Sequence, residues 1–172
     1  MIFVSKDLPQ FVPQDVCLSC DGCCRFAQAN SSWCPKMARE EIDPQKEAGV
    51  VLLNGLGESD VIKTVEHQGQ VRCVFFQVEG NTCHVYEDCP FECRLYPFLL
   101  VKRGDGVDVG VHLNCPYIQE KRQGEDFKGH VENLRQYFQQ QAALDFVRRN
   151  QILHGNYSGY EQEVECLFEL PL

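Results

Sequence analysis

The clearest hydrophobic pattern in the chain is an apolar stripe near its C-terminal end. Its members step by three or four positions: Phe127, Val131, Leu134, Phe138, Ala142 and Phe146. This spacing is one face of an α-helix, and it predicts a helix from about residue 125 to 150. Arg148 and Arg149 suit the negative C-terminal end of that helix. Such a stripe is typical of a face packed on a core, and we interpret it in that way.

The middle of the chain has the short apolar runs and turn signals of β-hairpins. Strands are expected at 61–66, 71–78, 98–103 and 107–113. The turn signals between them are Gln68-Gly69 and Gly104-Asp105-Gly106, and Glu79-Gly80-Asn81 leads into residues 82–86. Short helical segments are expected within 32–47 and at 90–95, after an extended arm at 1–16.

These elements predict a small α+β fold. An antiparallel sheet of hairpins from 61 to 113 is expected beside a metal-binding cysteine loop, with a C-terminal helix that covers it. We expect residues 1–120 to form a cysteine-cluster metal-binding domain, and residues 121–172 to form a helical extension packed on it.

Composition narrows the functional classes. An apolar fraction of 44% is enough for a real core, and the net charge of −9 argues against a nucleic-acid partner. No secretory signal develops after Met1, and no apolar run reaches the roughly 18–20 residues of a membrane helix. We therefore expect a cytoplasmic protein with no membrane partner, in which permanent disulfides are unfavourable and metal binding is favoured.

Four of the eleven cysteines fall within eight positions, as Cys17-x2-Cys20-x2-Cys23-Cys24. Convergent thiolates on one loop are the ligands of soft metals. The triple spacing matches the first three ligands of a bacterial ferredoxin, which favours an iron–sulfur cluster, although a zinc knuckle accepts the first pair equally well. A remote fourth ligand in such sites often precedes proline, as do Cys34, Cys89 and Cys115.

A second block contains Cys73, Cys83, Cys89 and Cys93. If a three-residue loop at 79–81 joins two strands, Cys83 lies opposite Gln77. Cys83 is then roughly 13 Å from Cys73, too far for both to bind one zinc ion. Either the two cysteines serve different metals, or residues 82–86 fold back.

Arginines follow two of the cysteines, as Cys24-Arg25 and Cys93-Arg94. A four-thiolate site carries net negative charge, so Arg25 and Arg94 are candidates to stabilise a bound cofactor. An ordinary surface arginine is an equally good interpretation of each. His84 and His112 are further candidate ligands, although solvated or core histidines are the more common outcome. Cys166 is expected to be a small buried apolar residue.

Together these motifs resemble the CxxCxxCC, or YkgJ-type, cysteine-cluster family. The resemblance covers residues 17 to 115. It rests on the first cysteine run, on Cys83-His84-Val85-Tyr86-Glu87 and on Cys93-Arg94-Leu95-Tyr96-Pro97. It implies zinc or iron chelation by Cys17, Cys20, Cys23, Cys24, Cys73, Cys83, Cys93 and Cys115. Cys34, Cys89 and Cys166 fall outside the family pattern.

Three functions remain open from the sequence. The first is a protein with iron or a 4Fe-4S cluster in a redox or accessory role, and the second is a structural zinc module that binds a protein partner. The third is a cluster-dependent protein methylase, because the family also resembles the cysteine region of flagellin lysine N-methylases. Whether the protein is an enzyme is not decided by its residues.

Overall fold

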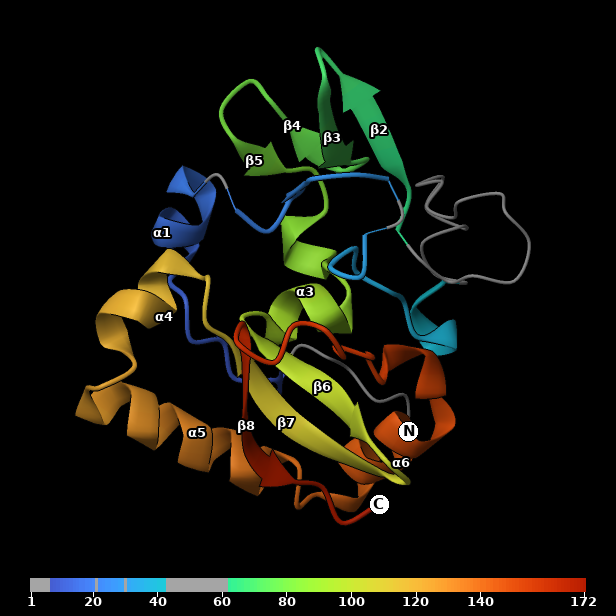
Figure 1. The fold of residues 1–172 in the computed structure, drawn as a ribbon, viewed down its shortest axis with the longest axis vertical. Coiled ribbons are helices and arrows are strands. Elements are labelled where there is room, and N and C mark those ends of the chain that lie inside the picture. The colour runs from blue at the N-terminus through green and yellow to red at the C-terminus, as the bar shows by residue number, and fades with distance from the viewer. Residues whose placement is uncertain (1–6, 21, 30, 43–61) are drawn as a thin grey trace. The chain divides into compact units, whose positions relative to one another are not determined.

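The structure is a computed structural model that describes residues 7–20, 22–29, 31–42 and 62–172 (Figure 1). Its chain forms two compact units. We call Gln14–Cys93 the cysteine unit, and Arg94–Leu172 together with Met1–Pro13 the C-terminal unit. In the described part of the chain, no helix has both the length and the apolar character needed to cross a membrane.

Short elements make up the cysteine unit. In chain order they are α1 Gln14–Ser19, β1 Arg25–Phe26, a helical turn at 39–42, β2 Thr64–His67, β3 Gln70–Cys73, β4 Phe76–Gln77, β5 Thr82–Cys83, the 3-10 turn η2 Tyr86–Asp88 and α3 Phe91–Leu95. Three strands form an antiparallel sheet in the order β1-β3-β2, and β4 pairs with β5. Gln68 and Gly69 have φ values of 52° and 75°, as a tight two-residue hairpin turn between β2 and β3 requires.

The C-terminal unit has a regular antiparallel sheet. Its strands are β6 Phe98–Arg103, β7 Gly106–His112 and β8 Val164–Glu169, in the order β6-β7-β8. A register shift falls at Val109/Gly110. A Cβ on Gly110 would lie 2.9 Å from Val101 Cγ2 and 3.1 Å from Glu165 O, so only glycine fits between the neighbouring strands.

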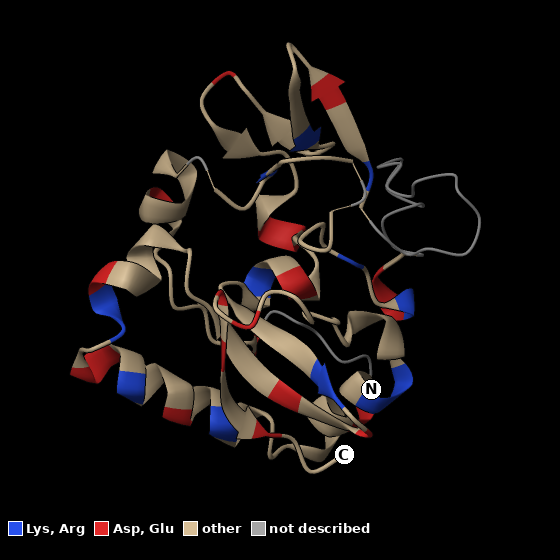
Figure 2. Ribbon diagram, in the orientation of Figure 1, with Lys and Arg blue, Asp and Glu red and all other residues tan. Residues whose placement is uncertain are grey.

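Helices of the C-terminal unit follow β7 in the chain. They are α4 Pro116–Lys121, α5 Glu125–Tyr137, α6 Gln141–Arg149 and the 3-10 turn η3 Gln151–Leu153. Basic and acidic residues alternate along α5, where Lys128 pairs with Glu125 and Arg135 with Glu132 (Figure 2). Leu134, Phe138 and Phe146 of the predicted stripe are fully buried and Phe127 is buried, so most of the stripe is a core face. Ala142 is exposed, so the prediction is wrong at that position.

The predicted α+β fold class, with small antiparallel sheets and a C-terminal helix, is confirmed. The single sheet expected from 61 to 113 is wrong in detail, because its strands belong to three separate sheets. The division at residue 120 stays a prediction. The single helix predicted over 125–150 is wrong in detail, because the chain leaves α5 at Phe138 and begins α6 at Gln141. The predicted strand 71–78 is also interrupted, since it turns at Val74 and Phe75 and buries the Phe75 ring. Residues 43–47 and 61 of the predicted elements lie outside the described part of the chain.

Candidate metal centre

The first cysteine run begins in a helix. Cys17 lies in α1, which ends at Ser19, and the Cys20 N–H donates to Cys17 O at 3.2 Å. The chain then turns back, with the Arg25 N–H donating to Gly22 O at 3.1 Å. A Cβ on Gly22 would lie 3.2 Å from the Cys20 sulfur. Glycine at this position therefore leaves room for the Cys20 thiol.

The β1-β3-β2 sheet carries two of the predicted ligands on one face. Residues Phe26 and Val71 lie opposite each other in β1 and β3, and Cys24 is two positions before Phe26. The Cys73 N–H donates to Cys24 O at 2.9 Å, which continues the ladder by one residue pair. Because side chains alternate along strands, Cys24, Cys73, Phe26 and Val71 share a face. We call it the cysteine face.

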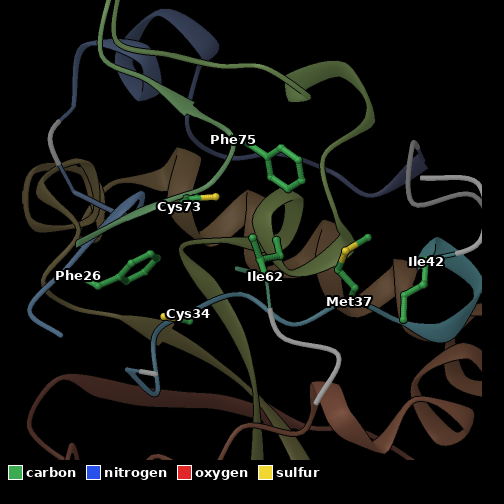
Figure 3. Close-up of a cluster of buried hydrophobic side chains, with 7 residues drawn as sticks. All are labelled: Phe26, Cys34, Met37, Ile42, Ile62, Cys73 and Phe75. Carbon is green, nitrogen blue, oxygen red and sulfur yellow. The ribbon is translucent and has the colours of Figure 1, made fainter. Parts of the chain in front are cut away.

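An apolar cluster lies against the cysteine face. Its buried members are Phe26, Cys34, Met37, Ile42, Ile62, Cys73 and Phe75, and Figure 3 shows them together. Three further cysteines pack against this cluster: Cys24, Cys83 and Cys93. Five thiols from five segments of the chain therefore surround one small core.

The register of the second cysteine block differs from the prediction. Cys83 lies opposite Phe76, not Gln77. The interruption at Val74 and Phe75 also means that Cys73 and Cys83 do not lie along one straight strand. The predicted separation of roughly 13 Å between them therefore does not apply. Cys73 and Cys83 interact electrostatically and share the apolar cluster, so both can face one centre.

The pKa shifts of the thiols follow from which sulfurs are neighbours. A hydrogen bond from the Cys23 thiol lowers the pKa of Cys17 to about 7, against a smaller opposing effect of burial. A separate hydrogen bond between Cys23 and Cys24 lowers the pKa of Cys24, assisted by the charge of Arg25. The pKa of Cys23 itself is raised by its hydrogen bonds to both neighbours. The first cysteine run is therefore one hydrogen-bonded group at Cys17, Cys23 and Cys24.

Burial is the largest cause of the pKa shifts of the thiols in the second block. It raises the pKa of Cys73 to about 12, and raises the pKa values of Cys83 and Cys93. The thiolate of Cys24 adds repulsion to all three, so the two blocks form one electrostatically connected group. At neutral pH the buried thiols are protonated, and a metal cation that binds them must displace their protons.

Two carboxylates join the segments that carry Cys34 and Cys93. Glu41 accepts the Ala38 N–H at 2.9 Å within its own helical turn and the Phe91 N–H at 2.7 Å at the start of α3. Glu92 accepts the Lys36 N–H at 2.6 Å. Glu41 satisfies backbone donors at two helix starts, and both carboxylates link α3 to the segment that follows Cys34.

Asn81 was not singled out by the sequence as a functional residue. Its side-chain amide donates to Leu18 O and to Cys20 O, the latter at 3.3 Å, and accepts from Arg25 Nη2 at 3.1 Å. Its backbone has a φ of 51°, which asparagine tolerates better than most residues. The Gly80-Asn81 turn signal located the turn, but only the structure shows that Asn81 holds the first cysteine run.

The remaining candidates fall in several environments. Buried Cys34 interacts with Cys73, and buried Cys89 with Cys93, so both lie beside predicted ligands. Cys115 is buried at the N-cap of α4 in the C-terminal unit. The prediction that Cys166 is buried is wrong, because it lies exposed on β8 beside exposed Glu165.

The histidines and arginines have their own partners. His84 is exposed and its Nδ1 lies 3.0 Å from Gln77 Nε2, while His112 Nδ1 lies 2.9 Å from the Tyr96 hydroxyl. The Arg25 guanidinium lies 4.5 Å from the centre of the Phe76 ring. Arg94 is half-buried in α3. Cofactor binding by Arg25 and Arg94 stays a prediction.

The described part of the chain contains many potential metal ligands, but they do not form a complete site for one ion. Among residues 7–20, 22–29, 31–42 and 62–172, no three Cys, His, Asp or Glu side chains converge tightly enough to hold one ion. The chemistry of the donors nevertheless fits a soft metal, because thiols are the large majority of the potential ligands around the cluster.

A small α+β unit whose core is lined with thiols defines a cysteine-rich metal-chelating protein. The chain belongs to the CxxCxxCC family, described as "Putative zinc- or iron-chelating domain", whose family model matches residues 16–124. This match supports metal binding and confirms the resemblance seen in the sequence. No curated protein and no solved structure matches the chain.

Proposed function

We propose that the protein binds iron, as a 4Fe-4S cluster or as iron ions, and serves a redox or accessory role in the cytoplasm. The proposed ligands are drawn from Cys17, Cys20, Cys23, Cys24, Cys73, Cys83, Cys93 and Cys115. The observation that supports this most is that two cysteine blocks meet around one apolar cluster. When bound, such a cluster would supply one-electron transfer.

The residues of the cysteine unit suit that role. Thiolates would hold the metal, while Phe26, Phe75 and Met37 would exclude water from it. Arg25, whose charge already lowers the pKa of Cys24, would offset part of the negative charge of the thiolates. The number of neighbouring thiols exceeds the four that a single zinc ion takes, which favours a multinuclear centre.

Anaerobic purification tests this proposal directly. Iron, acid-labile sulfide, zinc and visible absorbance would be measured per chain. We expect iron with matching sulfide and a brown colour that bleaches on reduction. A colourless protein with stoichiometric zinc and no iron would overturn the iron assignment.

Structural zinc is the second candidate, because the thiols belong to the core of the cysteine unit. If zinc holds that core together, its removal should unfold the unit. Trp33 is the only tryptophan and packs against the apolar cluster, so its fluorescence reports on this unit. An unchanged Trp33 spectrum after chelation would exclude the structural role.

A further inference from the structure

The β1-β3-β2 sheet has a second face, opposite the cysteine face. Arg25 lies opposite Arg72, and Arg72 lies opposite Val65, so these three side chains form one row across the strands. Gln70 and His67 form the next row on the same face. The single acidic residue within these three strands, Glu66, lies opposite Val71 and so belongs to the cysteine face. We call the face with Arg25 and Arg72 the arginine face.

Arg72 is an unusual residue on this face. Only 6% of it is exposed, and its buried Nε has no hydrogen-bond partner among the residues that the structure describes. A buried polar atom of a charged group that has no hydrogen-bond partner lowers the stability of the fold. Like charges placed directly opposite each other on neighbouring strands add further repulsion. An anion bound between Arg72 and Arg25 would reduce both costs.

Arg25 is held in place for such a contact. Asn81 accepts a hydrogen bond from its Nη2, and the Phe76 ring lies against its guanidinium. Arg25 and Arg72 lie directly opposite in an antiparallel pair, with Cα atoms about 4.5–5.5 Å apart, so their side chains leave the sheet side by side. Guanidinium groups bind phosphate and carboxylate with paired, charge-assisted hydrogen bonds.

We propose that the arginine face is an oxyanion site that takes the phosphate or carboxylate group of a small molecule. The site adjoins the proposed metal centre, since Arg25 follows Cys24 and Arg72 precedes Cys73 in the chain. A ligand there would lie on the other side of the two strands that carry these cysteines. The protein would thereby combine metal chelation with recognition of an anionic molecule.

Titration with inorganic phosphate tests the site. Melting temperature and heat of binding would be measured at constant ionic strength, on metal-loaded protein from which free metal has been removed. Wild type should show saturable binding of one phosphate per chain. Arg72→Met should weaken it about ten- to a hundredfold, because a charged hydrogen-bonding group is lost. Titration with acetate then distinguishes a phosphate site from a carboxylate site.

A matched control removes one exposed positive charge from the C-terminal unit. Lys128→Gln, in α5, should bind phosphate as wild type does, and it reports any general effect of phosphate on stability. Arg72→Lys keeps the charge without the planar fork and should bind with intermediate affinity, which keeps the test valid if Arg72→Met does not fold. Absence of saturable binding of either anion to wild type, or equal phosphate binding by wild type and Arg72→Met, would overturn the proposal.

Metal content separates this proposal from the proposed function. If phosphate binds only to metal-free protein, the metal–thiolate centre itself compensates Arg72, and the oxyanion site is wrong. If the protein binds no iron but binds phosphate through Arg72, the proposed function fails and the oxyanion site stands.

Discussion

His130 should make the C-terminal unit sensitive to acid. Its ring lies in α5 with 8% of the residue exposed, between Phe11 and Phe98 at centroid distances of 5.0 and 5.1 Å. The buried Nε2 has no hydrogen-bond partner among the described residues. Burial in these apolar surroundings lowers the pKa of His130 from 6.5 to about 4, because the charged form is poorly solvated there.

The sign of the pH effect follows from that shift. Between pH 6.5 and 4 the unfolded chain protonates this histidine and the folded chain does not, so the free energy of unfolding falls as pH falls. A shift from 6.5 to about 4 corresponds to about 3.4 kcal/mol when the whole interval is crossed. Between pH 7 and pH 5, a loss of about 2 kcal/mol is expected.

The assay is guanidinium denaturation followed by circular dichroism at pH 7 and pH 5, for wild type and His130→Phe. Phenylalanine has a similar shape and no titrating group, so this variant should lose about 2 kcal/mol less than wild type between the two pH values. Trp33 fluorescence, recorded in the same samples, marks unfolding of the cysteine unit. Acid release of metal affects both proteins equally and cancels in the comparison. Equal pH dependence in wild type and variant would refute the reasoning.

Three further predictions concern the cysteine unit. Cys20→Ser should lose bound metal, whereas Cys166→Ser, at an exposed position on β8, should keep full metal content. Elemental analysis of the two variants measures this. The reverse result would contradict the ligand assignment. In Asn81→Gly, glycine tolerates the φ of 51°, but the hydrogen bonds to Leu18 O and Cys20 O are lost. Metal affinity, measured by chelator competition, should therefore fall about tenfold. Unchanged affinity would rule out the positioning role of Asn81. Glu41→Gln places an amide against one of two backbone N–H donors and should lower the free energy of unfolding by about 1.5–3 kcal/mol. Urea unfolding followed by Trp33 fluorescence measures this change. An unchanged midpoint would count against the carboxylate link.

Local patterns predicted the elements whose partners are close in sequence. The hairpin of β6 and β7 follows from alternating residues around Gly104, whose φ of 56° is easily adopted by glycine. Strand β8 was missed because it pairs with β7 across more than fifty residues, and nothing in its own six residues specifies that partner. The break between α5 and α6 was missed because the apolar residues keep helical spacing through it, from Phe138 to Ala142 and Phe146.

The proposed metal centre was predictable to the extent that its candidate ligands are local. Spacing alone singled out the first cysteine run, in which Cys17, Cys23 and Cys24 form one hydrogen-bonded group. The relation of Cys73 to Cys83 was not predictable, because it depends on a chain reversal at Val74 and Phe75 driven by burial of one aromatic ring. Asn81 was missed for a similar reason, since its bonds reach residues more than sixty positions away.

The apolar core of the cysteine unit contains several of the proposed metal ligands, which couples metal binding to folding. In the apolar cluster, Cys34 and Cys73 are buried among Phe26, Met37 and Phe75, so the thiols are part of the packing that holds the short strands together. Burial raises the pKa of Cys73 to about 12, which means that the apo unit is packed around protonated sulfurs. A metal that replaces those protons contributes its binding free energy to folding of the same segments. Chain regions that are remote in sequence are therefore expected to gain stability together when metal binds.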